Sequence, residues 1–232
     1  MQNDLTIYSK FAHEWWEDGA PRFRSLQNLT PFRLSLIEEL IGELRGKKVL
    51  DLGCGGGLIA IPLLKKGVSV VGIDISKESI AAAKRAANGD GEFFVGDITS
   101  IDLPAQQFDC VLIADVLDHI PKYENVLREA ERLLRPGGKL FVGTLNRTFI
   151  SWFLTIFLGE TLGFIPKGTH DHALFIKPDE LIEAAKQFNL DLVHVQGEWP
   201  LFFKTIIRRA ITLKKSGSVA VAYSIVFEKR VR

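Results

Sequence analysis

The stretch "VLDLGCGGG", from Val49 to Gly57, decides the fold of this chain. It begins as a short run that is apolar except for Asp51, which is typical of a strand buried on both faces of a parallel sheet. It ends in a cluster of glycines, which lets the backbone turn sharply and approach a ligand. The helix expected next would present free backbone N–H groups to that ligand. The stretch therefore predicts the first strand and the ligand-binding loop of an α/β domain.

Strand and helix patterns alternate on both sides of this stretch. Apolar runs at 68–74, 91–97, 108–114 and 139–145 are separated by amphipathic segments, and two further strand patterns occupy 190–195 and 218–229. This alternation is typical of a parallel sheet covered by helices on both faces. We therefore predict an α/β fold with a doubly wound, mostly parallel, seven-stranded sheet of the Rossmann-like type.

The 232 residues are enough for one substantial core, and we predict a single domain over 1–232. Residues 1–45 are expected to form a helical lid, and 46–145 the cofactor-binding core. Residues 146–175 read as an insertion on the substrate side, and 176–232 as a C-terminal helix and strands.

Composition limits the possible cellular location of the protein and the classes of its partners. The net charge is +1, so no basic excess points to nucleic acid as a partner. The two cysteines, Cys54 and Cys110, form neither a disulfide framework nor a metal-binding pattern. The first residues lack the basic and apolar pattern of a secretory signal, and no apolar run is long enough to span a bilayer. We expect a cytoplasmic protein.

The spacing of the glycines separates two kinds of nucleotide cofactor. A dinucleotide loop needs G-x-G-x-x-G, but Leu58 stands where the third glycine would be. The spacing present is Asp51-x-Gly53-x-Gly55-x-Gly57, which is similar to the loop of methyltransferases that use S-adenosylmethionine (SAM). An NAD-dependent oxidoreductase is therefore disfavoured, and SAM is the expected cofactor.

Acidic residues follow the next two strands. Asp74 lies about 20 residues beyond Gly53, where a carboxylate can accept both hydroxyls of a ribose. Asp97 and Ile98 end the third strand, where an acid and an apolar side chain could hold an adenine. A tight turn or helix cap explains any one of these residues, but their joint placement favours SAM binding. Cys54 and Ile75 complete the contacts predicted beside them.

The chain resembles the O-methyltransferases of ubiquinone biosynthesis, which methylate a ring hydroxyl of a polyprenylated catechol. The resemblance runs from about residue 11 to 181 and is carried by "FAHEWWEDG", "PFRLSLI", "VLDLGCGGGLIA", "LDHIP", "RPGGKLFVGTLNR" and "PKGTHDHALFIKPDEL". It implies a hydrophobic aromatic substrate, and it places cofactor contacts at Arg33, Gly53, Asp74 and Ala114. Gln27 and Thr30 depart from the family, which usually has His and Asn there.

The segment "ADVLDHIP" places an imidazole and two carboxylates after the fourth strand. The family has Glu-x-x-Glu-His there, which resembles a divalent metal site; here the carboxylates are the shorter Asp115 and Asp118. Ionising a phenol requires either His119 as a general base or a metal such as Mg²⁺ held by Asp115, Asp118 and His119. Alternatively, Asp118 caps a helix and His119 packs. His170 and Asp171, in the insertion, either contact substrate or hold their loop.

Two apolar segments suggest contact with a membrane surface. "FISWFLTIFLG" is too short to span a bilayer and reads as a buried helix or as a wall for a prenyl tail. "FFKTIIRRAITLKK" reads as a basic amphipathic helix able to lie on anionic lipid, carrying Lys204, Arg208, Arg209, Lys214 and Lys215. We expect peripheral contact with the inner face of the membrane.

The sequence thus predicts a SAM-dependent O-methyltransferase acting on a hydrophobic, catechol-type aromatic. Two alternatives stay open: a methyltransferase for an unrelated small molecule, and a non-catalytic SAM-binding member of a membrane-associated biosynthetic complex.

Overall fold

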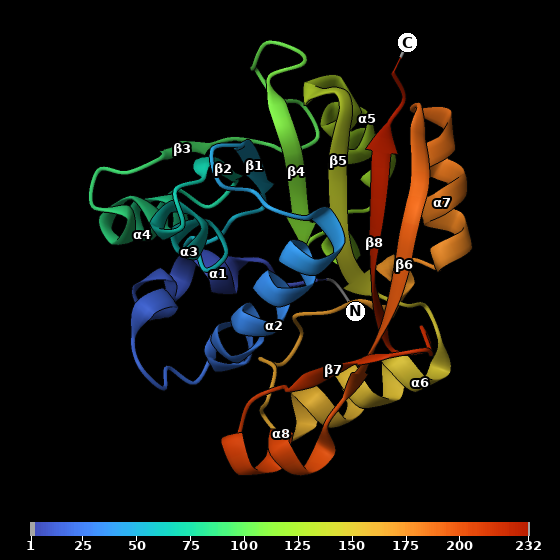
Figure 1. Ribbon diagram of the computed structural model, residues 1–232. Helices are drawn as coiled ribbons and strands as arrows, with labels where there is room; N and C mark the ends of the chain where they lie inside the picture. The colour runs from blue at the N-terminus through green and yellow to red at the C-terminus, as the bar shows by residue number, and fades with distance from the viewer. Residues whose placement is uncertain (1–2, 232) are drawn as a thin grey trace.

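The computed structural model describes residues 3–231, which form an α/β fold around one sheet (Figure 1). The strand order is β3-β2-β1-β4-β5-β8-β6-β7. In chain order the strands are β1 (Lys48–Leu52), β2 (Ser69–Asp74), β3 (Glu92–Val95), β4 (Phe108–Ala114), β5 (Leu134–Leu145), β6 (Leu190–Pro200), β7 (Leu213–Ser216) and β8 (Ala222–Lys229).

The sheet is mixed. Strands β1 to β5 are mutually parallel, β8 pairs antiparallel with both β5 and β6, and β7 pairs antiparallel with β6. The prediction of a Rossmann-like α/β sheet is confirmed, but the sheet has eight strands where seven were predicted. The additional strand is β7, whose sequence "LKKS" lacks the apolar alternation that identifies a strand.

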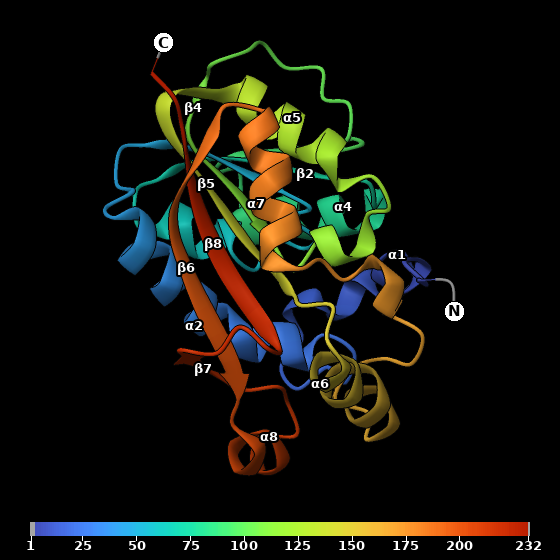
Figure 2. The same ribbon diagram turned by 90° about the vertical axis from the view of Figure 1, so that its right-hand side faces the viewer.

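Helices cover both faces of the sheet (Figures 1 and 2). Buried residues of α2 (Arg24–Ile41), α3 (Ala60–Lys65) and α4 (Lys77–Ala87) pack in one hydrophobic cluster. Those of α5 (Tyr123–Leu133) and α7 (Pro178–Gln187) pack in the other. The RPGG segment directly follows α5 and belongs to β5.

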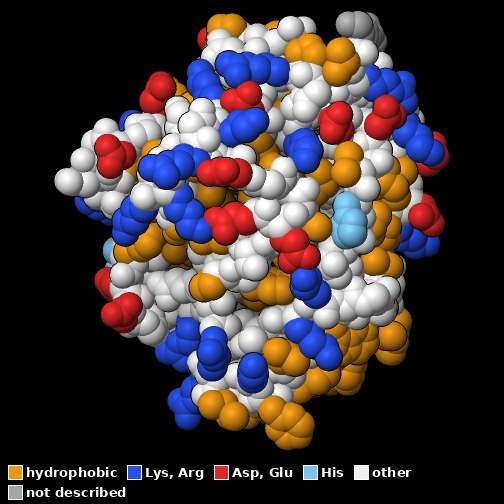
Figure 3. All heavy atoms as spheres, in the orientation of Figure 1, with side chains coloured by type: hydrophobic (Ala, Val, Ile, Leu, Met, Phe, Trp, Pro, Cys, Tyr) orange, Lys and Arg blue, Asp and Glu red, His pale blue; other side chains and the backbone are white. Residues whose placement is uncertain are grey.

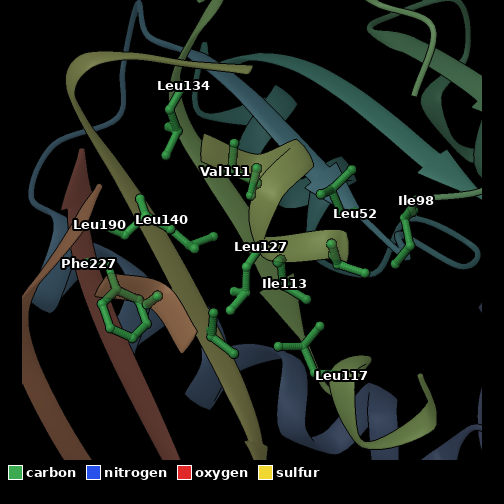
Figure 4. Packing of buried hydrophobic residues seen from close by; sticks show 14 of the residues in the cluster. Leu52, Ile98, Val111, Ile113, Leu117, Leu127, Leu134, Leu140, Leu190 and Phe227 are labelled. Carbon is green, nitrogen blue, oxygen red and sulfur yellow. The ribbon is translucent and has the colours of Figure 1, made fainter. Parts of the chain in front are cut away.

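Strand β4 shows how one apolar run serves both clusters. Val111 and Ile113 pack in the cluster with α5 and α7 (Figure 4), whereas Cys110 and Leu112 pack on the opposite face. Successive side chains of a strand point to opposite faces, so a strand buried on both must be apolar throughout. The sheet is thus a rigid support for the loops at its strand ends.

Shorter elements surround the carboxyl ends of the parallel strands. They are α1 (Thr6–Lys10), η1 (Ala12–Trp16), η2 (Leu117–His119), α6 (Phe149–Trp152), the π-helix η3 (Phe153–Glu160), η4 (His172–Leu174) and α8 (Phe202–Arg208). The long basic helix expected over 202–215 is wrong in extent, because the chain turns at Arg209, whose φ is 51°, and then enters β7. Within residues 3–231, no helix combines the length and apolarity needed to cross a bilayer.

Candidate active site

The glycine loop after β1 touches two other segments so closely that side chains would not fit. A Cβ on Gly53, which has a φ of 73°, would lie 2.6 Å from the Val116 side chain. A Cβ on Gly56 would lie 2.3 Å from the Trp15 ring. The Trp16 indole N–H donates to the Gly56 carbonyl oxygen at 2.8 Å. The glycines therefore let the N-terminal aromatic residues close over the loop.

A cavity of about 440 Å³ lies at this edge of the sheet. Its walls include every residue predicted to bind the cofactor: Arg33, Asp51, Gly53, Cys54, Gly55, Asp74, Ile75, Asp97, Ile98 and Ala114. These residues come from five separate parts of the chain; four of them lie at the ends of parallel strands, as the topology predicted, and Arg33 reaches the cavity from α2. We call this the cofactor cavity.

Asp74 and Asp97 are oriented by local hydrogen bonds. The Asp74 carboxylate accepts the backbone N–H groups of Gly55 and Ser76 at 2.9 and 2.8 Å. Burial raises the Asp74 pKa, and these two backbone bonds oppose the rise. Asp97 accepts the backbone N–H of Thr99 at 2.8 Å and remains exposed. Both carboxylates are fixed in direction and retain lone pairs for a ligand.

Asp51 is an acid in an unfavourable environment. Its side chain is 3% exposed, and its Oδ2 atom has no hydrogen-bond partner. Burial, together with the negative charge of Asp74, raises the pKa of Asp51 to about 7. A buried, unsatisfied carboxyl group costs free energy unless a ligand completes it. This carboxyl group is suited to a ligand that carries a positive charge.

Arg33 lies at the centre of a buried network of charges. It donates to both Asp115 oxygens at 2.9 and 2.6 Å, and to both Glu198 oxygens at 2.5 and 2.6 Å. Ser224 also donates to Glu198, at 2.6 Å. Asp115 has a φ of 58°, a conformation that non-glycine residues rarely adopt. Both oxygens of the Asp115 carboxylate therefore accept hydrogen bonds from Arg33. Glu198, the second partner of Arg33, was not identified by any sequence pattern.

A second cavity, of about 130 Å³, adjoins the first. The two share Tyr8, Leu26, Leu29, Arg33, Asp115 and His119 as walls. Away from this junction the second cavity is mainly apolar, with walls that include Leu154, Phe164, Ile165, Ile211 and Leu213. We call it the apolar cavity. It lies between the insertion after β5 and the segment that joins α8 to β7.

Asp118, His119 and His170 meet at the junction of the two cavities. One potential ligand atom from each lies within 4.8 Å of the others. The His119 and His170 rings stack with centroids 5.1 Å apart, and Thr144 donates to Asp118 at 3.1 Å. Burial lowers the pKa of His119, and Asp118 opposes that effect. His119 is therefore largely neutral at pH 7 and able to accept a proton.

The residues of the predicted metal site do not all lie together in the structure. Asp118 and His119 lie together, His170 joins them from the insertion, and Asp115 faces Arg33 instead. Mg²⁺ prefers oxygen ligands, whereas two imidazoles and one carboxylate form a donor set that suits zinc-like ions. The cluster does not fit Mg²⁺ well. Asp171 holds its own loop, by accepting the backbone N–H of Ala173 at 3.0 Å.

Aromatic residues of the N-terminal region pack together beside the site. The Trp15 ring stacks on Phe23 with centroids 4.0 Å apart, and its indole N–H donates to Ser79 at 3.0 Å. Tyr8 lies between this stack and His119. Gln27, one of the two departures from the family pattern, donates to the Trp15 carbonyl oxygen at 3.0 Å. Its side chain thus supports the tryptophan segment.

The fold defines the class of protein. Residues 50–142 match the methyltransferase domain family. The structure is similar to that of a Thermotoga maritima SAM-dependent methyltransferase described as a possible histamine N-methyltransferase (TM-score 0.68, 18% identity, covering 97% of this chain and 99% of that one). It is also similar to magnesium protoporphyrin IX methyltransferase from Synechocystis PCC 6803, solved with bound S-adenosylhomocysteine (TM-score 0.68, 17% identity, covering 97% and 95%). The chain has the fold of the SAM-dependent methyltransferases.

Sequence relatives narrow the class to one family. The ubiquinone biosynthesis O-methyltransferase of Leptothrix cholodnii is 37% identical over 207 residues, which cover 85% of this chain and 88% of that protein. The Coxiella burnetii enzyme of the same name is 38% identical over 200 residues, covering 84% and 85%. The chain belongs to the ubiquinone biosynthesis O-methyltransferase family, and it is a SAM-dependent O-methyltransferase of quinone biosynthesis. The resemblance and the SAM cofactor predicted from the sequence are confirmed.

Proposed function

We propose that the acceptor is a catechol-type phenol with an apolar, prenyl-like tail. The observation that carries this proposal is the junction of the two cavities at His119. A ring placed there would have its hydroxyl beside the imidazole and beside the cofactor cavity. The apolar cavity would take the tail, because removing prenyl carbons from water is favourable by about 0.8 kcal/mol per methylene-sized group.

In this arrangement SAM lies along the edge of the sheet. Asp74 accepts the ribose hydroxyls, and Asp97 with Ile98 holds the adenine. The unsatisfied Oδ2 of Asp51 accepts from the ammonium group of the methionine end, which relieves the cost of burying that carboxyl group. Arg33 holds Asp115, the residue that directly follows β4, through two hydrogen bonds.

Methyl transfer then follows from the position of His119. Its Nε2 accepts the proton as the O–H bond of the acceptor breaks, and the phenolic oxygen forms a bond to the methyl carbon. The carbon–sulfur bond breaks, and its electron pair stays on sulfur. The products are the methyl ether, S-adenosylhomocysteine and a protonated imidazole, which passes its proton to solvent. General-base assistance of this kind contributes about 10²–10⁴-fold in rate.

The test is mass-spectrometric detection of methyl transfer from SAM to a short-chain prenylated catechol. Parallel reactions contain EDTA, added Zn²⁺ or added Mg²⁺. Equal turnover in EDTA supports His119 as a base that needs no metal. Turnover that EDTA abolishes and Zn²⁺ restores assigns a metal to Asp118, His119 and His170. Absence of product, alongside demonstrable SAM binding, contradicts the proposed acceptor.

We also propose that the enzyme binds peripherally to an anionic membrane surface. Apolar side chains are exposed on both segments that flank the apolar cavity, including Phe149 (73%) and Leu162 (60%) on one side and Phe203 (85%) and Ile207 (80%) on the other. Figure 3 shows hydrophobic atoms gathered over α6 and α8, with basic side chains near α8. An apolar surface with a basic rim suits a bilayer of anionic lipid.

Flotation with anionic vesicles at low salt tests this contact. The wild-type protein should float with the vesicles, and the double variant Phe203→Ser/Ile207→Ser should float less. The matched control, Phe94→Ser, removes an exposed aromatic ring from β3, away from these segments. Wild-type protein that stays with the dense fraction contradicts the proposal.

A further inference from the structure

Asn3 makes two hydrogen bonds to one residue, and that residue is His119. Its side-chain Nδ2 donates to the His119 carbonyl oxygen at 3.1 Å. Its Oδ1 lies 2.8 Å from Nδ1 of the His119 ring. The contact joins the start of the described chain to the junction of the two cavities.

The pair of contacts fixes which atom of the amide faces the ring. If the amide were turned over, Oδ1 would face the His119 carbonyl oxygen, and two acceptors would repel each other at that distance. The observed orientation therefore presents an acceptor, Oδ1, to the imidazole. An acceptor there requires the proton on Nδ1 of His119. In the neutral ring, the lone pair is then on Nε2.

With the proton on Nδ1, the surroundings of Nε2 determine where His119 can act as a base. Nε2 lies 3.7 Å from the Asp118 carboxylate, and the His170 ring stacks on the His119 ring with centroids 5.1 Å apart. Tyr8 packs edge-on against the same ring, with centroids 6.2 Å apart. These two ring contacts restrict the plane of the imidazole, and Asn3 sets its protonation pattern.

We propose that Asn3 is a positioning residue. It holds His119 in the Nδ1–H tautomer, so that Nε2 is free to act as the base toward the hydroxyl of the phenol substrate. The proposal rests on the proposed function of His119 in proton transfer. Partners that orient metal-bound imidazoles affect metal affinity or activity by about 10- to 100-fold when they are removed, and we expect an effect of similar size on this imidazole.

The first measurement is independent of activity. The ¹⁵N shifts of the histidine rings report the tautomer directly, and loss of signals in His119→Gln assigns them among the five histidines. Wild-type His119 should show the proton on Nδ1. Asn3→Ala should shift it toward the Nε2–H form, and Asn3→Asp, which keeps an acceptor oxygen, should retain Nδ1–H.

The second measurement is kinetic. Asn3→Ala should lower kcat about 10-fold, while the calorimetric Kd for SAM stays unchanged, and Asn3→Asp should recover most of kcat. Leu5 and Thr6 line the cofactor cavity, so a variant that merely detached this segment would weaken SAM binding as well. Lys10→Ala, an exposed change in the same segment, serves as the control and should match wild type.

The outcomes separate this inference from the function on which it rests. A wild-type spectrum with Nε2–H overturns the positioning role, as does an Asn3→Ala variant with unchanged spectrum and kcat. An Asn3-dependent Nδ1–H signal in an enzyme that keeps full activity after His119→Gln instead overturns His119 as the base.

Discussion

The two cavities that meet at His119 are built in different ways. The cofactor cavity is formed by loops that directly follow parallel strands, closed by residues of the N-terminal region, and two of its acids, Asp74 and Asp97, are oriented by neighbouring backbone N–H groups. The apolar cavity is formed by segments from the N-terminal region, the insertion and the C-terminal region, which pack against one another. The acids of the first cavity are placed by the strand ends of the sheet, whereas the tail-binding walls of the second depend on contacts between segments distant in sequence.

The largest expected effect falls where the cavities join. His119→Ala should lower kcat by about 10²–10⁴-fold, because proton removal would depend on solvent. The Kd for SAM should change little, since other residues supply the cofactor contacts. Single-turnover methyl transfer and calorimetry separate the two quantities. Full turnover in this variant would remove His119 from the chemistry.

A second change tests the cofactor cavity alone. Asp74→Ala should weaken SAM binding by at least about 100-fold, because hydrogen bonds to a charged group each contribute about 1.5–3 kcal/mol and two would be lost. Calorimetric titration with SAM measures the loss. Asp97→Ala, at an exposed site, should cost less than Asp74→Ala. The opposite order would place the ribose elsewhere.

The apolar cavity should respond to the acceptor instead. Leu213→Trp would fill space among the walls of this cavity. We expect the KM for a prenylated catechol to rise about 10-fold, which corresponds to about 1.4 kcal/mol of lost tail burial. The KM for a catechol without a tail, and the Kd for SAM, should stay near wild type. An equal rise in KM for both acceptors would contradict a tail-binding role.

The smallest predicted effect is a dependence of SAM affinity on pH. The pKa of Asp51 is raised to about 7 in the free protein, so below that pH the carboxyl group is largely neutral. An ammonium beside it favours the ionised form, so SAM binding should release a proton near pH 6. Affinity should rise by at most about tenfold per pH unit toward pH 7 and then level off.

Calorimetry in two buffers of different ionisation enthalpy measures the released proton. Asp51→Asn carries no titrating group at this position and should show neither the release nor the dependence. Wild-type titrations that are identical in both buffers at pH 6 would place the SAM ammonium away from Asp51.

The different construction of the two cavities explains which site residues could be predicted from the sequence. Each cofactor residue except Arg33 lies within a few residues of a strand end, so predicting the strands placed Asp51, Asp74 and Asp97 at one edge. Arg33 came from the family resemblance. Two features depend on packing between distant elements: the hydrogen bonds from Arg33 to Asp115, and the burial of Glu198 beside them.

The acceptor side could be predicted only in part. The segment at Asp118 and His119 was identified from its composition after a strand. His170 was suggested by its place in the insertion, and its stacking on His119 required the folded chain. Asn3 gave no local signal. The strand β7 was also missed, because pairing with β6, rather than an apolar pattern, holds it in place.

The Arg33 network has a consequence for the exchange of product for fresh cofactor. One guanidinium is shared by two carboxylates, so the network beneath the junction carries a negative charge in excess. In the binding mode proposed above, this charge would attract the sulfonium cation of SAM across a partly buried site. Transfer of the methyl group leaves a neutral thioether, and the attraction disappears with it. We therefore expect the network to favour SAM over S-adenosylhomocysteine, which would help the next molecule of SAM to compete for the cavity.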